Sequence, residues 1–151
     1  MDLESQQLED GAAGLITVTK QFHFHAAHSV PQVKDCQQVH GHTYHLGVTI
    51  GGDRKGPDQI EEGMIANARR IKSQVKDAVV DRLDHAFIAC GDEKIVPALK
   101  ERDYRVVEIG VRTTAENLSE WILERLQEET DLFILKVRLW ETPSMYVEAH
   151  P

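Results

Sequence analysis

Residues 21–50 read QFHFHAAHSVPQVKDCQQVHGHTYHLGVTI and decide the fold, because a polar loop joins two long alternating segments. Apolar and polar side chains alternate in residues 15–28 and again in residues 40–52, with the two-residue period of a β-strand. Six of the chain's eight histidines lie in this stretch. The stretch therefore predicts a pair of strands with histidines on both faces.

The rest of the chain predicts two amphipathic helices and two further strands. Residues 64–83 place apolar side chains every four positions, and residues 113–129 carry a second apolar stripe. Residues 132–143 form a clear strand, and residues 144–150 are expected to return beside it. Residues 83–110 are expected to be a connection with one short helical turn and one short strand. The expected fold class is α+β, an antiparallel four-stranded sheet with two helices packed on one face.

Length and composition limit the function classes. A chain of 151 residues is about one domain, which we place at residues 15–151, after a flexible N-terminal tail at residues 1–14. The net charge of −8 excludes a general nucleic-acid binder. No apolar run approaches the roughly 18 residues of a membrane span, and the acidic N-terminus does not resemble a signal peptide. Two cysteines cannot form a disulfide framework, so the expected compartment is the cytoplasm.

Strand parity sorts the histidines into two groups. His28 shares the apolar face of the first strand, and His40 and His42 share the apolar face of the second. If the two strands pair as a hairpin, these three imidazoles meet at its loop end. Three neutral imidazoles form a zinc site with an open fourth position, as in catalytic rather than structural sites.

The other three histidines of the stretch point to the opposite face. His23, His25 and His45 are therefore expected to face solvent or an interface. A single His-x-His motif is a weak signal, and the alternative is a set of surface histidines that bind no metal. Gly41, between His40 and His42, would let another backbone or a ligand approach closely.

Cys36 and the pair Asp84–His85 are candidates for proton transfer. Cys36 precedes His40 by four residues and could be a fourth metal ligand, a thiolate nucleophile or base, or an inert thiol. Asp84 and His85 follow the first predicted helix, where capping of the helix end is the simpler explanation. In the functional interpretation they form an acid–base set with Cys36.

Glu141 ends an otherwise apolar row formed by Phe133, Leu135, Val137 and Leu139. A carboxylate there can accept two parallel hydrogen bonds from a planar, guanidine-like edge, although a solvated strand end is the alternative. Thr113 and Glu116 fit a Thr-x-x-Glu capping box at the start of the second helix, which explains both residues without a ligand.

Together these elements resemble a known family. His28, followed by CQQVHGH, LDH, TTAEN and ETP, is similar to the 6-pyruvoyltetrahydropterin synthase/6-carboxytetrahydropterin synthase family over nearly all of the chain after residue 14. The resemblance implies the tunnelling fold and a homo-oligomer, either a trimer or a hexamer of two stacked trimers. It also implies zinc bound by His28, His40 and His42. The implied catalytic residues are Cys36, Asp84 and His85. The implied contacts to the pterin are Glu141, Thr113, Thr114 and Glu116.

Within the family, three residues between the cysteine and His-Gly-His resemble the 6-carboxytetrahydropterin synthases of the queuosine pathway. The resemblance implies conversion of 7,8-dihydroneopterin triphosphate to 6-carboxytetrahydropterin, acetaldehyde and triphosphate, with zinc as Lewis acid and template. The alternatives are a 6-pyruvoyltetrahydropterin synthase, which eliminates triphosphate without cleaving a carbon–carbon bond, and a non-catalytic binding module in which Cys36 completes a structural zinc site.

Overall fold

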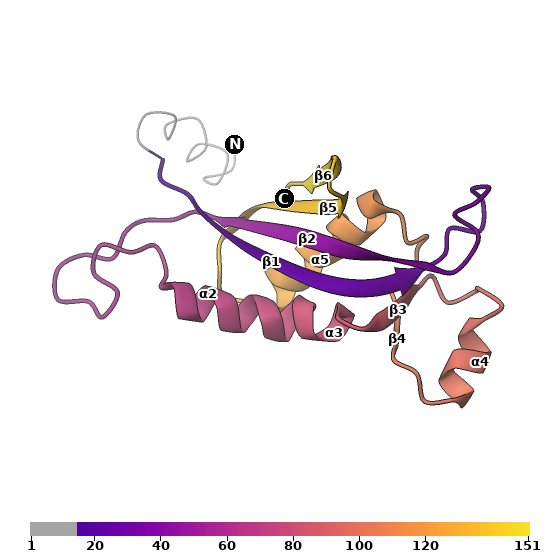
Figure 1. Ribbon diagram of the computed structural model, residues 1–151. Helices are drawn as coiled ribbons and strands as arrows, with labels where there is room; N and C mark the ends of the chain where they lie inside the picture. The colour runs from indigo at the N-terminus through magenta and orange to yellow at the C-terminus, as the bar shows by residue number, and fades with distance from the viewer. Residues whose placement is uncertain (1–14) are drawn as a thin grey trace, which may run out of the picture.

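The computed structural model describes residues 15–151, so the tail predicted for residues 1–14 lies outside the described part (Figure 1). Strands β1 (Val18–His28) and β2 (His40–Ile50) form one long antiparallel pair. Their register runs from Val18 opposite Ile50 to His28 opposite His40. The hairpin predicted from alternation is confirmed.

The sheet has six strands in the order β4-β3-β1-β2-β5-β6, so the predicted four-stranded antiparallel sheet is wrong in strand number and direction. The four expected strands are antiparallel neighbours, with β5 (Ile134–Thr142) and β6 (Met145–Ala149) beside β2. The added strands, β3 (Ala86–Ala89) and β4 (Val106–Glu108), pair in parallel with β1 and with each other. Helix α4 (Val96–Glu101) lies in the connection between them.

The physical reason for the missed strand is that short strands carry little periodic signal. All four side chains of β3 are buried, so its sequence AFIA does not alternate, and β4 has only three residues. Their parallel pairing also depends on residues far apart in the chain, which a local pattern cannot reveal.

The first predicted helix is continuous but not uniform. It consists of α2 (Ala68–Val75), a π-helical segment η1 (Lys76–Val80) and α3 (Asp81–Leu83). Ile71, Val75, Val79 and Leu83 are all at most 1% exposed. A spacing of four exceeds the 3.6 residues of an α-helical turn, and the wider π turn keeps the later apolar residues on the face toward the sheet.

The second helix, α5 (Ala115–Glu129), buries Leu118, Ile122 and Leu126, as its stripe predicts. Its N-cap is Thr114, whose hydroxyl accepts a hydrogen bond from the Asn117 backbone N–H at 3.3 Å. The predicted capping box of Thr113 and Glu116 is therefore wrong by one residue. The N-cap at Thr114 leaves the Thr113 side chain available for another contact.

A β-bulge changes the predicted parity of β5. Thr49 pairs with Lys136 and Ile50 with Ile134, so Leu135 is the extra residue on this strand. Ile134 is consequently buried and Phe133 is 63% exposed, contrary to the predicted row. Beyond the bulge the prediction holds, because Val137 and Leu139 are fully buried.

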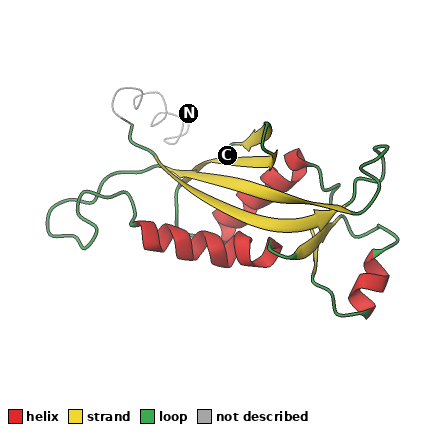
Figure 2. Ribbon diagram, viewed as in Figure 1, coloured by secondary structure: helices red, strands yellow, loops and turns green. Residues whose placement is uncertain are grey.

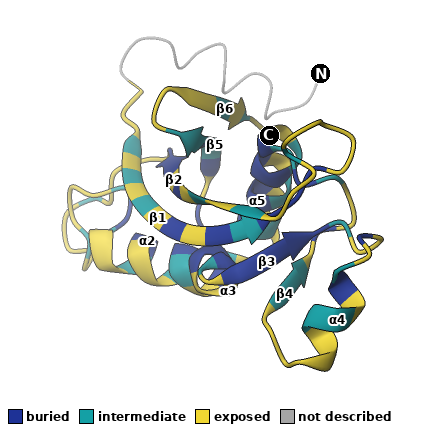
Figure 3. Cartoon of the chain, turned by 45° about the vertical axis from the view of Figure 1, so that its right-hand side comes forward, coloured by how far each residue is buried: buried dark blue, intermediate teal, exposed yellow. Residues whose placement is uncertain are grey.

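The helices α2 and α5 cover one face of the sheet (Figure 2). In Figure 3 strand β1 shows bands of buried or intermediate residues that alternate with exposed ones. This face is apolar along most of the hairpin, apart from Lys20, and becomes polar at the loop end, where His28, His40 and His42 lie. None of the helices within residues 15–151 is long and apolar enough to cross a bilayer.

Candidate metal centre

The structure brings together the three histidines that parity selects. His28 lies opposite His40 in the β1–β2 register, and His42 follows on the same face. Their ring centroids are 4.6, 5.1 and 4.9 Å apart, and one nitrogen of each lies within 4.8 Å of the others. Within residues 15–151 this is the one group of His, Cys, Asp or Glu donor atoms spaced to hold a metal ion.

Backbone carbonyls fix the orientation of two of these rings. His28 Nδ1 donates to the Thr113 carbonyl oxygen at 2.9 Å, and His40 Nδ1 donates to the Gln38 carbonyl oxygen at 2.8 Å. A carbonyl oxygen can only accept, so each Nδ1 carries the proton and each neutral ring presents an Nε2 lone pair. Hydrogen bonds of this kind orient histidines that bind metals.

Burial keeps the first of these rings neutral. His28 is 1% exposed, and burial lowers its pKa from 6.5 to about 4. Burial also lowers the pKa of His42. A metal ion requires neutral imidazole, so the site is prepared for a cation rather than for protons.

Glu141 adds a negative charge to the same space. Its Oε1 lies 3.5 Å from His28 Nε2 and 3.8 Å from His42 Nε2. Of the apolar row predicted to end at Glu141, only Val137 and Leu139 lie on the buried face, and the structure places the carboxylate against the histidines rather than in bulk solvent. The carboxylate lies close to two of the three imidazoles, although the group of mutually close donor atoms contains the histidines alone. A negative charge beside imidazole nitrogens fits a divalent cation.

Tyr44 lies beneath this group and received no role from the sequence. Its ring stacks on Phe24 at 5.0 Å and lies 5.5 Å from the His42 ring. The side chain is fully buried, and its hydroxyl has no hydrogen-bond partner among the described residues. Burial raises the pKa of Tyr44, and the charge of Glu141 raises it further. The only sequence signal was its parity, since Tyr44 shares the face of His40 and His42.

Thr113 supports the metal centre from the loop before α5. It is 1% exposed, and its hydroxyl donates to the Ser29 carbonyl oxygen and lies 3.2 Å from His28 Nδ1. Thr113 therefore orients His28, a contact that the sequence did not predict. Thr114 serves as the helix N-cap, and Glu116 is exposed in the first turn of α5. Binding of a pterin by these residues stays a prediction.

Cys36 lies in the loop between β1 and β2. Its carbonyl oxygen accepts a hydrogen bond from the Val30 backbone N–H at 2.7 Å, and its thiol is partly exposed. It does not belong to the group of converging metal donors. This placement does not support metal ligation by Cys36, and its role in proton transfer stays a prediction.

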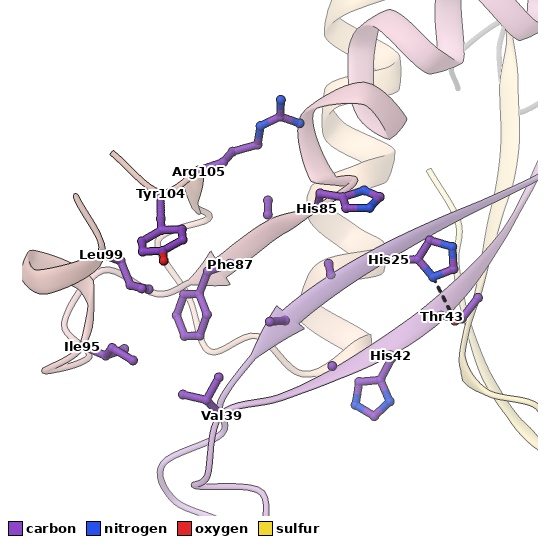
Figure 4. Close-up of a pocket in the computed structure, with 14 residues that line it drawn as sticks. His25, Val39, His42, Thr43, His85, Phe87, Ile95, Leu99, Tyr104 and Arg105 are labelled. Carbon is purple, nitrogen blue, oxygen red and sulfur yellow. Dashed lines mark hydrogen bonds between the residues drawn. The ribbon is translucent and has the colours of Figure 1, made fainter. Parts of the chain in front are cut away.

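Asp84 and His85 lie on the face of the sheet opposite to the metal centre. His85 Nδ1 is 3.0 Å from Asp84 Oδ2, and the His85 ring lies 6.0 Å from that of His25, an exposed residue (Figure 4). The His25 backbone N–H donates to Asp84 Oδ1 at 2.8 Å. This hydrogen bond, followed by the one with His85, lowers the pKa of Asp84. The pair is preorganised, but within one chain the sheet separates it from His28 and His42.

His85 borders a cavity of about 620 Å³ at the end of the hairpin, beside α4, and His42 also belongs to its lining (Figure 4). Its lining joins apolar side chains with groups that carry or accept protons, and includes Phe87, Leu99, Tyr104, His25, His85 and Arg105. Arg105 Nη1 donates to the Asp84 carbonyl oxygen at 2.9 Å and supports the turn in which His85 has a φ of 59°. The sequence did not predict this cavity, because it depends on β3, β4 and α4.

Sequence comparison identifies relatives over most of the chain. The sequence model of the family described as 6-pyruvoyl tetrahydropterin synthase matches residues 17–151. The 6-carboxy-5,6,7,8-tetrahydropterin synthase of Haemophilus influenzae is 34% identical over 141 residues, which cover 89% of this chain and 98% of that protein. The 6-pyruvoyl tetrahydrobiopterin synthase of Dictyostelium discoideum is 35% identical over 112 residues, or 74% of this chain and 70% of that protein.

Solved structures show the same fold. The 6-pyruvoyl tetrahydropterin synthase of Caenorhabditis elegans superposes with a TM-score of 0.67 at 22% identity, over 91% of this chain and 96% of that one. The enzyme of the same name from Plasmodium falciparum gives a TM-score of 0.70 at 20% identity, over 91% and 98%. At these identities the likeness concerns the fold alone.

The mixed sheet, its two covering helices and the three converging imidazoles define an α+β protein with a candidate metal centre at the end of a β-hairpin. The chain belongs to the 6-pyruvoyl tetrahydropterin synthase family. The family expected from the sequence motifs is confirmed, and the relatives are pterin synthases.

Proposed function

We propose that this chain is a zinc-dependent 6-carboxy-5,6,7,8-tetrahydropterin synthase. Its substrate would be 7,8-dihydroneopterin triphosphate, and its products 6-carboxytetrahydropterin, acetaldehyde and triphosphate. The observation that carries the proposal is the set of three inward-facing imidazoles with two carbonyl-fixed tautomers, in a chain aligned almost end to end with a relative of that name. The product would serve queuosine or 7-deazapurine biosynthesis.

Each group of candidate site residues would have its own chemical role. His28, His40 and His42 would hold the zinc, which as a Lewis acid makes the hydroxyls of the substrate side chain more acidic. Glu141 would anchor the pterin through its amino group and adjacent ring N–H, which match two carboxylate oxygens. Thr113, Thr114 and Glu116 would border the pterin, Thr113 also through its hold on His28.

Cys36 would move protons to and from the substrate carbon chain, supported by Asp84 and His85. Asp84 and His85 lie across the sheet from the side chains of the metal centre of their own chain, so we assign them to the metal centre of a neighbouring copy. This placement supports the predicted homo-oligomer, a trimer or hexamer, in which one site combines residues of two chains.

A 6-pyruvoyltetrahydropterin synthase is the second candidate. The 6-pyruvoyl tetrahydrobiopterin synthase of Dictyostelium is as similar in identity, at 35%, although it aligns over a smaller share of both chains. The two candidates share substrate, metal and triphosphate elimination and differ in the carbon–carbon cleavage. The third possibility is a non-catalytic zinc module closed by Cys36, which the position of Cys36 outside the donor group does not favour.

Product analysis distinguishes these functions. Purified protein loaded with zinc is incubated with 7,8-dihydroneopterin triphosphate, and pterin products and acetaldehyde are measured by chromatography and mass spectrometry. We expect 6-carboxytetrahydropterin and acetaldehyde in equal amounts. A 6-pyruvoyl product without acetaldehyde would support the second candidate. Cys36→Ala is the matched control and should retain zinc but lose turnover; loss of its zinc together with an inactive wild type would support the structural module.

A further inference from the structure

We propose that Glu141 is the fourth ligand of the metal in the substrate-free protein and that a pterin draws it away. The first half concerns the metal centre alone, and the second half rests on the proposed function. None of the sequence motifs assigns a carboxylate to the metal, since the spacing of His28, His40 and His42 accounts for three ligands only.

The distances fit a shared coordination sphere. Ligands bound at 2.0–2.1 Å to a tetrahedral zinc ion are separated from one another by roughly 3.3 to 3.4 Å. His28 Nε2 and His42 Nε2 are 3.1 Å apart, and Glu141 Oε1 lies 3.5 and 3.8 Å from them. These three atoms therefore already stand within about half an ångström of the spacing that ligands of one zinc ion require.

The electrostatic environment of Glu141 also favours a cation at this position. Because Nδ1 of His28 donates to the Thr113 carbonyl oxygen, Nε2 is the ring nitrogen that faces Glu141. The Glu141 side chain is only 17% exposed, so water screens its negative charge weakly. A metal ion bound by Nε2 and by the carboxylate would compensate this charge.

Strand β5 fixes the position of the Glu141 carboxylate beside the metal centre. Glu141 follows Val137 and Leu139, which are fully buried against the helices, and β5 pairs with β2 up to Trp140 opposite His45. The carboxylate therefore reaches the metal centre from a rigid strand and not from a loop. Immediately beyond this pairing, β5 has an irregular register with β6 between Trp140 and Thr142, which leaves Glu141 outside the regular ladder.

A planar ligand would compete for the same carboxylate. A pterin offers two parallel N–H donors, and a carboxylate that accepts both cannot keep its oxygen on the metal. Binding of the pterin would thus vacate the fourth position at the moment when the substrate side-chain hydroxyls arrive there. Metal and pterin would be coupled through a single side chain.

The first test uses the metal alone. Cobalt(II) replaces zinc in the full chain, and its visible absorption spectrum reports the ligand set; zinc affinity is measured by competition with a chelator. We expect Glu141→Gln to change the cobalt spectrum and to raise the zinc dissociation constant roughly 10- to 100-fold. Glu120→Gln, an exposed glutamate on α5, is the matched control and should change neither.

An unchanged cobalt spectrum in Glu141→Gln would overturn the proposal, even if zinc affinity fell, because the carboxylate would then act only through space. The second test adds unsubstituted pterin, which lacks side-chain hydroxyls, to wild-type cobalt protein. We expect the spectrum to move toward that of Glu141→Gln as pterin fluorescence reports binding. A constant spectrum with bound pterin would overturn the displacement, whereas catalytic failure in product analysis would leave the metal result standing.

Discussion

At the scale of single residues, the metal centre depends on two backbone carbonyls. Those of Thr113 and Gln38 accept the Nδ1–H of His28 and His40 and thereby direct both Nε2 lone pairs to one point. His42 completes the set, with its Nε2 at 3.1 Å from that of His28. The ligand set is therefore fixed before a metal binds, which reduces the ordering cost of coordination.

The first prediction concerns these three rings. His28→Ala, His40→Ala and His42→Ala should each lose the zinc that the wild type holds at about one per chain, because two neutral imidazoles form an incomplete catalytic site. His23→Ala and His45→Ala are the controls, since both side chains lie on the opposite face. Zinc is measured by atomic absorption after dialysis. Equal loss from the controls would refute the parity on which the site rests.

The second prediction concerns Tyr44, whose hydroxyl is buried without a partner. Tyr44→Phe should raise the free energy of unfolding of the metal-free protein by about 1–2 kcal/mol, because it removes an unsatisfied polar group and keeps the ring stack on Phe24. Urea denaturation followed by circular dichroism measures this change. A destabilised variant would mean that the hydroxyl has a partner, and Phe24→Leu should be destabilising in either case.

At the scale of elements, the β1–β2 hairpin is the part that positions the metal centre. Its register brings His28 opposite His40, and Gly41 lies between two of the three ligands. A Cβ added at Gly41 would stand 3.2 Å from the Ala26 carbonyl oxygen, which belongs to the backbone of β1. The close approach expected at this glycine is confirmed, and the neighbouring atom cannot move without shifting the strand.

The third prediction follows from that contact. Gly41→Ala should push β1 and β2 apart locally, lower the free energy of unfolding by about 1–3 kcal/mol and weaken zinc binding. Gly47→Ala on the same strand is the matched control, because its new Cβ would meet only side-chain atoms at 3.6 Å or more. Thermal unfolding and chelator competition measure the two effects. If both variants behave alike, the tight approach at Gly41 has no role in the site.

At the scale of the whole molecule, the two faces of the sheet carry different groups of candidate site residues. The helix-covered face ends in His28, His42 and Glu141, and the opposite face carries Asp84 and His85 beside His25. Both groups belong to the expected site, yet a single chain holds them apart. The homo-oligomer proposed above would unite them.

The fourth prediction tests this division by mixing inactive chains. His42→Ala lacks the metal centre and His85→Ala lacks the acid–base pair, so each alone should be inactive. Co-expressed in equal amounts, they should recover about a quarter of wild-type turnover, because random assembly joins an intact centre to an intact pair at that frequency. Turnover of 7,8-dihydroneopterin triphosphate measures recovery. No recovery in verified mixed oligomers would mean that each pair serves its own chain, and an oligomer of His42→Ala with His42→Ala/His85→Ala is the negative control.

The local periodicity of the sequence was sufficient to predict the central hairpin, the first helix and the three candidate metal ligands. The alternation of residues 15–28 and 40–52 predicted β1 and β2, and their parity selected His28, His40 and His42. The four-residue spacing from Ile71 to Leu83 predicted the first helix. Such predictions succeed because the side chains of a regular element alternate by a fixed angle, so neighbours in sequence report their face directly.

Only the tertiary structure decided the rest. The parallel strands β3 and β4, the bulge at Leu135 and the N-cap at Thr114 depend on distant partners or on a shift of one residue. The same holds for the contact of His28 with Thr113, 85 residues away, and for the approach of Glu141 to the imidazoles. These features arise from packing between elements, and the free energy that selects them is a property of contacts that no local pattern contains.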